Sequence, residues 1–156
     1  MRMSRQFDSP GNDEDKRALI GQLSESFHSR DLAWLEDPSI HVSRTSIHPA
    51  DIDWDGRESW AATHEPGKVR EKRKEIKRGN DKPVVVVDRP HHSDLMIMDG
   101  HHHAEAYTQL LGKPAEDQNK NVRALHGLMP VYTVSVPRTT GPWDELHNKQ
   151  EHNKNA

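Results

Sequence analysis

Residues 83–111, PVVVVDRPHHSDLMIMDGHHHAEAYTQLL, decide the fold because their apolar residues change from strand-like runs to helical spacing within one short stretch. The β-branched run 84–87 predicts a buried strand, and the apolar run 95–98 predicts a second strand after a polar turn. Asp99 and Gly100 end that strand. From residue 101 the apolar residues instead follow helical spacing, and a glycine and a proline end the helix. The residues on that helical face are Ala104, Tyr107, Leu110 and Leu111.

The flanking segments add a few further elements. Alternating apolar residues in 40–52 predict a strand that enters a loop, and those in 131–136 predict a last strand. Residues 68–78, KVREKRKEIKR, predict a helix that stops at Gly79. Apolar residues at helical spacing in 15–35 predict one amphipathic helix or a broken pair, which packs either on the domain or on a partner.

Together these elements predict an α/β (α+β) protein. The chain has 156 residues, of which 31% are hydrophobic, and its mean hydropathy is −1.02. This length favours one domain, and this polarity favours polar ends. We therefore expect a helical extension over 1–39, the domain over 40–137 and a flexible polar tail over 138–156.

Charge and cysteine content exclude several classes of function. The formal net charge is −3, so nucleic acid would have to bind through a local basic patch. Without cysteine, the chain forms no disulfide, thiolate nucleophile, Cys-bound zinc site or iron–sulfur cluster. Residues 1–15 lack the apolar core of a signal peptide, and no apolar run reaches 18 residues. These features predict a cytoplasmic protein without a membrane partner.

The predicted helix 68–78 is the one local basic patch in the sequence. It carries seven basic residues and two glutamates, while Val69 and Ile76 alone form a narrow apolar stripe. Its basic surface is either a phosphate-facing patch or an ordinary solvated face. If the patch contacts DNA, the contacting residues are Arg70, Arg73, Lys74 and Lys77.

Residues 99–105, DGHHHAE, are the strongest candidate for a binding site. Where a strand gives way to a helix, the first N–H groups of the helix lack intrahelical partners and carry the positive end of the dipole. Gly100 allows a sharp turn and a close approach to a phosphate, and residues 101–103 add imidazole donors. Asp99 either caps the helix or holds Mg²⁺, since one carboxylate does not do both.

The 12 histidines also raise the possibility of zinc, because five of them lie between His91 and His103. Successive residues at a helix start point about 100° apart, so at most two of the three adjacent histidines face one ion. Further ligands would have to come from His64, His91 or His92. We therefore do not expect a dedicated zinc site.

The stretch from Ile47 to Leu111 resembles the ParB/sulfiredoxin superfamily. The matching pieces are IHPADI (47–52), PGKVREKRKEI (66–76), KPVVVVD (82–88) and MDGHHHAEAY (98–107), in the order in which the superfamily has them. They span about two-fifths of the chain. The resemblance implies the ParB/sulfiredoxin-like fold, a small mixed sheet flanked by helices, with a phosphate-binding turn at a helix N-terminus.

The resemblance also implies residue roles. Lys68 stands where a Lys-Val pair contacts nucleotide phosphates, His102 inherits the phosphate-binding histidine, and Glu65 matches the catalytic base of the free serine kinases. His101 replaces the catalytic cysteine of sulfiredoxins, which excludes sulfinic acid reduction. The implied sets are Glu65, Asp99 and His101 for catalysis, and Lys68, Lys72, Gly100, His102 and His103 for phosphate or nucleotide binding.

His103 departs from the family pattern, which has an arginine at this position. Arginine is always charged, whereas histidine at a helix N-terminus is driven toward its neutral form. Three explanations are open. Lys68, Arg70 or Lys72 supplies the missing charge, the histidines bind a metal, or the site has become part of the scaffold.

The resulting hypothesis is a ParB-like enzyme, either a nuclease or a kinase-like nucleotide hydrolase, that uses ATP, ADP or CTP with Mg²⁺. The alternative is a non-catalytic ParB-like module that binds DNA, or a bacteriophage structural or interaction module in the host cytoplasm or the virion. In that case the N-terminal helix would serve a homo-oligomer or another assembly partner.

Overall fold

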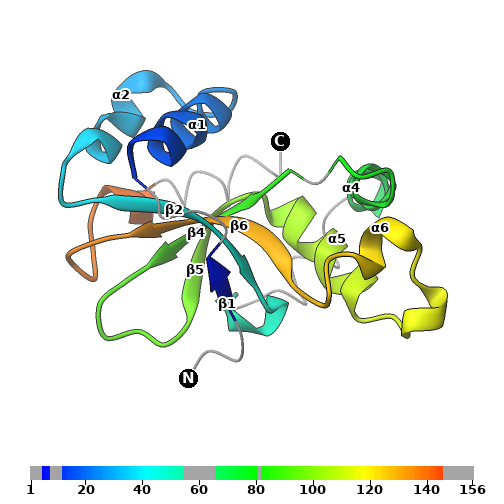
Figure 1. Cartoon of the computed structure of the whole chain (residues 1–156). Helices are drawn as coiled ribbons and strands as arrows, with labels where there is room; N and C mark the ends of the chain where they lie inside the picture. Colours follow the sequence, from blue (N-terminus) through cyan, green and yellow to red (C-terminus); the bar gives the residue numbers. More distant parts are fainter. Residues whose placement is uncertain (1–4, 8–11, 55–65, 81, 146–156) are drawn as a thin grey trace.

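The computed structural model describes residues 5–7, 12–54, 66–80 and 82–145, with the backbone alone described for 5–7 and Pro66. Over these residues the protein is a mixed α/β structure, in which helices cover both faces of one sheet (Figure 1). This agrees with the predicted class. Glu65, the predicted catalytic base, lies outside the described residues, as does His64.

The described strands form a six-stranded sheet in the order β1-β2-β6-β4-β5-β3. The strand pairs β1–β2, β2–β6 and β4–β5 are antiparallel, whereas β4–β6 and β3–β5 are parallel. The sheet is therefore mixed, as expected. The strands are β1 Arg5–Phe7, β2 His41–Ile47, β3 Ile52–Asp53, β4 Val84–Asp88, β5 Leu95–Asp99 and β6 Met129–Ser135.

The central strand β4 explains why the sheet has helices on both faces. Val84, Val85, Val86 and Val87 are all 0% exposed. Val85 and Val87 belong to one hydrophobic cluster, and Val84 and Val86 belong to the other, as the two-residue period of a strand requires. A continuous apolar run is thus the signature of a strand between two helical layers.

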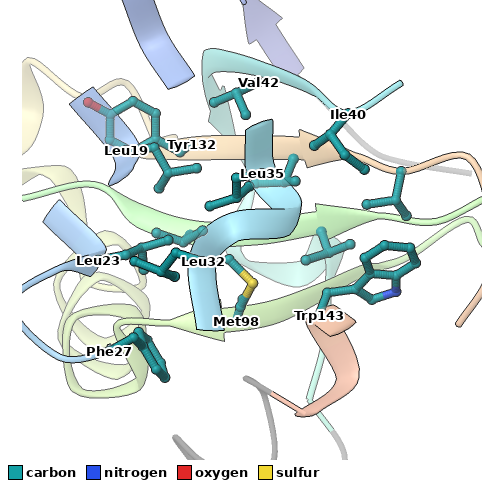
Figure 2. Packing of buried hydrophobic residues seen from close by; sticks show 14 of the residues in the cluster. Leu19, Leu23, Phe27, Leu32, Leu35, Ile40, Val42, Met98, Tyr132 and Trp143 are labelled. Atoms are coloured by element: carbon teal, nitrogen blue, oxygen red, sulfur yellow. The ribbon is translucent and has the colours of Figure 1, made fainter. Parts of the chain in front are cut away.

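One face is covered by the N-terminal helices α1 (Asp13–Leu23) and α2 (Ser29–Leu32) and the 3₁₀ helix η1 (Ala33–Glu36). Of the two arrangements predicted for 15–35, one long helix or a broken pair of helices, the structure therefore has the broken one. Figure 2 shows the α1 side chains Leu19 and Leu23 against the sheet, and both are 0% exposed. The helical extension therefore packs on the domain, and its leucines and Phe27 are buried within the same chain.

The other face is covered by α4 (Pro66–Lys77), α5 (His101–Leu111) and the short α6 (Lys120–Arg123) (Figure 1). The predicted stripe of α4 is confirmed, since Val69 and Ile76 are buried. The helix is followed by Gly79, which has a φ of +90° and so ends it in a left-handed turn. The 3₁₀ turns η2 (Pro49–Asp51) and η3 (Ala115–Asp117) connect the remaining elements.

The C-terminal segment contributes one large side chain to the core. Trp143 is 1% exposed and meets Trp34 edge-to-face, with 5.4 Å between the ring centroids. Residues 138–145 of the predicted tail therefore include a core residue, because the indole ring completes the cluster on the α1 side of the sheet. Residues 146–156 lie outside the described part of the chain.

None of the helices in the described segments is long and apolar enough to cross a membrane.

Candidate functional site

The candidate site begins where β5 ends and α5 starts. Gly100 occupies the N-cap position of α5 with φ 92° and ψ 36°, a left-handed conformation that glycine adopts without a steric penalty. A Cβ atom here would lie 3.5 Å from the Cα atom of Val84, so the turn also sits close on β4. The sequence motif DGHHH thus forms the predicted sharp turn into a helix.

Antiparallel pairing brings a second segment to this turn. Val85 of β4 lies opposite Asp99 of β5, so the residues that precede β4 lie beside the residues that follow β5. A hollow of about 180 Å³ forms there. We call it the histidine-turn hollow. It is bordered by residues 99–103, Lys72 of α4, Lys82 and Pro83 ahead of β4, Gln22 of α1 and Ser26, which follows α1.

The positive charge at the hollow comes from Lys72 and Lys82. Their side chains are 31% and 42% exposed. Each has one acidic neighbour: Lys72 Nζ lies 3.8 Å from Glu75 Oε2, and Lys82 Nζ lies 3.0 Å from Glu25 Oε2. Because such exposed ion pairs are weak, both ammonium groups are able to turn toward an anion in the hollow.

His103 adds no charge at neutral pH. Burial, and next the charges of Lys72 and Lys82, lower its pKa to about 4. Glu75 Oε2 lies 3.5 Å from His103 Nε2 and favours the charged form, but burial and the two lysines outweigh it. Of the three residues named as sources of the missing charge, Lys72 borders the hollow, whereas Lys68 and Arg70 do not.

The lowered pKa of His103 gives a pH-dependent stability. The unfolded chain binds a proton at this site below about pH 6.5, while the folded chain does so only below about pH 4. Stability from this group is therefore complete above pH 6.5 and is lost as the pH falls to 4, by an amount on the order of 3 kcal/mol. Chemical unfolding at several pH values should show this loss for the wild type relative to His103→Gln, which does not titrate. Equal pH dependence of the two proteins would contradict the burial of a neutral imidazole.

Asp99 lines the hollow but does not cap α5, because Gly100 holds the N-cap position. Burial raises the pKa of the Asp99 carboxyl, and Lys82 and a hydrogen bond from the Gly100 backbone partly oppose that rise. Of its two predicted roles, the capping role is thus wrong. The carboxyl remains the candidate oxygen ligand for Mg²⁺.

His101 differs from the expectation of a catalytic group. Its side chain is 0% exposed, and its ring packs edge-on against Trp54 with 5.2 Å between centroids. The ring of this first helical residue therefore packs against the residue that follows β3, although His101 is also one of the residues around the hollow. His102 is half-buried and is one of the residues around the hollow.

Lys68 is not among the residues that surround the hollow. It is exposed and lies one turn before Lys72 on α4, closer to the helix N-terminus. The structure therefore places Lys72, Gly100, His102 and His103 of the predicted phosphate set together, and leaves Lys68 apart.

The predicted DNA-contacting residues of α4 fall into two groups. Arg70, Lys74 and Lys77 are exposed. Arg73 instead faces α5, where its Nη1 donates a hydrogen bond to Gln109 Oε1. The side-chain amide of Asn121 donates to the Lys77 carbonyl at 2.8 Å, which sets the basic helix α6 beside the end of α4.

Lys82 is the residue that the sequence analysis missed. A signal was present in the two predicted strands 84–87 and 95–98 with a short turn between them. If two such strands pair antiparallel, the residue before Pro83 lies beside the Asp99–Gly100 turn. Among the described residues, no group of three His, Cys, Asp or Glu side chains is arranged to hold a metal ion.

Comparisons with known proteins returned no match: neither a family model nor a curated protein nor a solved structure resembles this chain significantly.

Proposed function

We propose that the histidine-turn hollow binds the phosphate groups of a nucleotide, and that the chain is a ParB-like nucleotide hydrolase or nuclease. The observation that supports this most is the convergence of the Gly100 turn with two lysines, Lys72 and Lys82, from separate parts of the chain. A helix N-terminus provides backbone donors for an anion, and the lysines provide the charge that His103 lacks.

The hollow suits a phosphate better than a larger group. It encloses about 180 Å³ and is bordered by polar side chains and by the first turn of α5. A hollow this small takes a phosphate while the rest of the nucleotide lies outside it. The residues also fit a magnesium ion that the phosphates carry in, because Mg²⁺ in such sites takes one or two carboxylates and completes its shell with phosphate oxygens and water. Asp99 would be the carboxylate, and the ion when bound would neutralise phosphate charge.

Hydrolysis in this proposal depends on Glu65, whose role rests on the family resemblance. A general base removes a proton from the attacking water or hydroxyl, which glutamine does not do. Glu65→Gln should lower the rate of ATP or CTP hydrolysis by about 100-fold or more and leave nucleotide affinity nearly unchanged. Phosphate release, measured beside equilibrium binding, tests both. Glu71→Gln, on the exposed side of α4, is the matched control, and full activity in Glu65→Gln would exclude this residue as the base.

The exposed basic surface favours a second candidate, a non-catalytic DNA-binding module. Lys74 and Lys77 of α4 and Lys120 and Arg123 of α6 lie on neighbouring elements, within a chain of net charge −3. If this surface contacts phosphates, affinity for duplex DNA falls steeply with salt. Lys74→Ala with Lys77→Ala should then reduce the salt slope by about two. DNA binding of this kind without nucleotide turnover would favour the module over the enzyme.

A further inference from the structure

A second, larger cavity lies on the other side of α5 from α4. It encloses about 510 Å³, within the range of about 300–1,000 Å³ that is usual for small-molecule sites. Its walls come from the segment 48–54, from α5 and from residues 126–128. None of the residues assigned to the histidine-turn hollow borders it.

The cavity exists because α5 presents small residues on this face. Ala104, Thr108 and Gly112 are spaced four residues apart and so lie above one another along the helix, and all three border the cavity. On the opposite side, the chain passes through two successive left-handed residues, His126 at φ 53° and Gly127 at φ 78°. A left-handed histidine is uncommon, and such strained residues gather at ligand sites.

The lining is mostly apolar with a few polar groups. Pro49, Ile52, Trp54, Leu111 and Leu128 supply the apolar walls. An aromatic side chain among aliphatic ones favours a flat apolar ring as the occupant, because such a ring buries large area in close contact.

The polar side chains at the cavity indicate which substituent the aromatic ring of the ligand carries. The Nδ1 atom of His48 accepts a hydrogen bond from the Ala50 backbone N–H at 3.0 Å, so the imidazole proton lies on Nε2 as a donor. The Thr108 hydroxyl donates to the Ala104 carbonyl at 2.7 Å and keeps only its acceptor capacity. His126 is an exposed second imidazole at the cavity. Donors from two histidines match an anionic or carbonyl oxygen on the ligand.

We propose that this cavity is a binding site for a small planar aromatic molecule that carries a carboxylate or similar acceptor. The ring lies between α5 and the Ile52–Trp54 segment, and the oxygen faces His48 and His126. This site is separate from the proposed nucleotide site and does not depend on it.

The test uses the full chain with two probes, indole-3-carboxylate and indole, titrated by calorimetry. Indole-3-carboxylate should bind one molecule per chain, more tightly than indole. Thr108→Phe fills the cavity and should weaken binding of both probes at least tenfold, while the matched variant Thr108→Val keeps the shape and should change it less than twofold. His48→Asp keeps an N-cap acceptor for η2 but has no side-chain N–H donor, so it should weaken binding of indole-3-carboxylate and leave that of indole nearly unchanged.

A second measurement uses the wild type, so that the proposal can be tested even if the Thr108→Phe variant does not fold. The methyl resonances of Ala104 and Thr108 should shift as either probe is added, because both residues border the cavity. Absence of saturable binding, unshifted methyl resonances, or undiminished affinity in a folded Thr108→Phe would each overturn the proposal.

Discussion

Trp143→Ala should lower the free energy of unfolding by about 3–5 kcal/mol, the loss usual for a fully buried tryptophan. The indole is 1% exposed, packs on Trp34 and donates from Nε1 to the Thr139 carbonyl at 3.4 Å. Figure 2 shows it in the same cluster as Leu35 and Met98, on the α1 side of the sheet. Removing it leaves a cavity that the sheet and helices are unable to close fully.

Urea unfolding measures this loss of stability. Two further variants serve as a control and as a second test of the same packing. Glu145→Ala changes an exposed neighbour and should have almost no effect. Gly141→Ala should destabilise in the same way as Trp143→Ala, because a Cβ atom at residue 141 would overlap the indole ring. A Trp143→Ala protein as stable as the wild type would show that residues 138–145 are a dispensable tail, as their polar sequence first indicated.

The second large effect concerns Lys72 and Lys82. Each single alanine variant should weaken ATP or CTP binding about tenfold, and the double variant about 100-fold, because each removes one charge-assisted contact to phosphate. The physical reason is that His103 is neutral at pH 7, so these two ammonium groups supply the positive charge around the hollow. Equilibrium binding with a fluorescent nucleotide at fixed salt gives the three constants.

Lys74→Ala is the matched control for this series. Lys74 lies on the same helix as Lys72 but is exposed and is not part of the hollow. It should change nucleotide affinity less than twofold. Equal losses for Lys74→Ala and Lys72→Ala would mean that the helix attracts nucleotide through its overall charge and not through the hollow.

Much of the fold was predictable because the spacing of apolar residues along the sequence distinguishes its strands from its helices. The run 84–87 and the switch to helical spacing after Gly100 predicted β4, β5 and α5, and the structure confirms these elements within one or two residues. The packing of 13–36 was harder to predict, since it depends on a sheet face that forms from β2, β4, β5 and β6 together. Long-range burial of this kind leaves no local pattern.

The part of the site that one short sequence motif forms was predictable, whereas the parts that depend on contacts between distant segments were not. The turn at Gly100 follows from one short motif, and the structure confirms it. The orientations of His101 and Arg73 depend on Trp54 and Gln109, which pack against them from other segments. Lys82 joins the hollow through strand pairing. The larger cavity depends on two small residues of α5, on Gly112 directly after it and on a turn further along the chain.

The central claim, that the histidine-turn hollow holds nucleotide phosphates, is tested most directly by isothermal titration. The full chain is titrated with ATP, ADP and CTP, with and without Mg²⁺, beside His102→Ala and the control His92→Ala. His92 is exposed in the turn before β5 and is not part of the hollow. We predict that at least one nucleotide binds the wild type and His92→Ala alike, and binds His102→Ala at least tenfold more weakly. No binding of any nucleotide, or equal binding to all three proteins, would contradict the account.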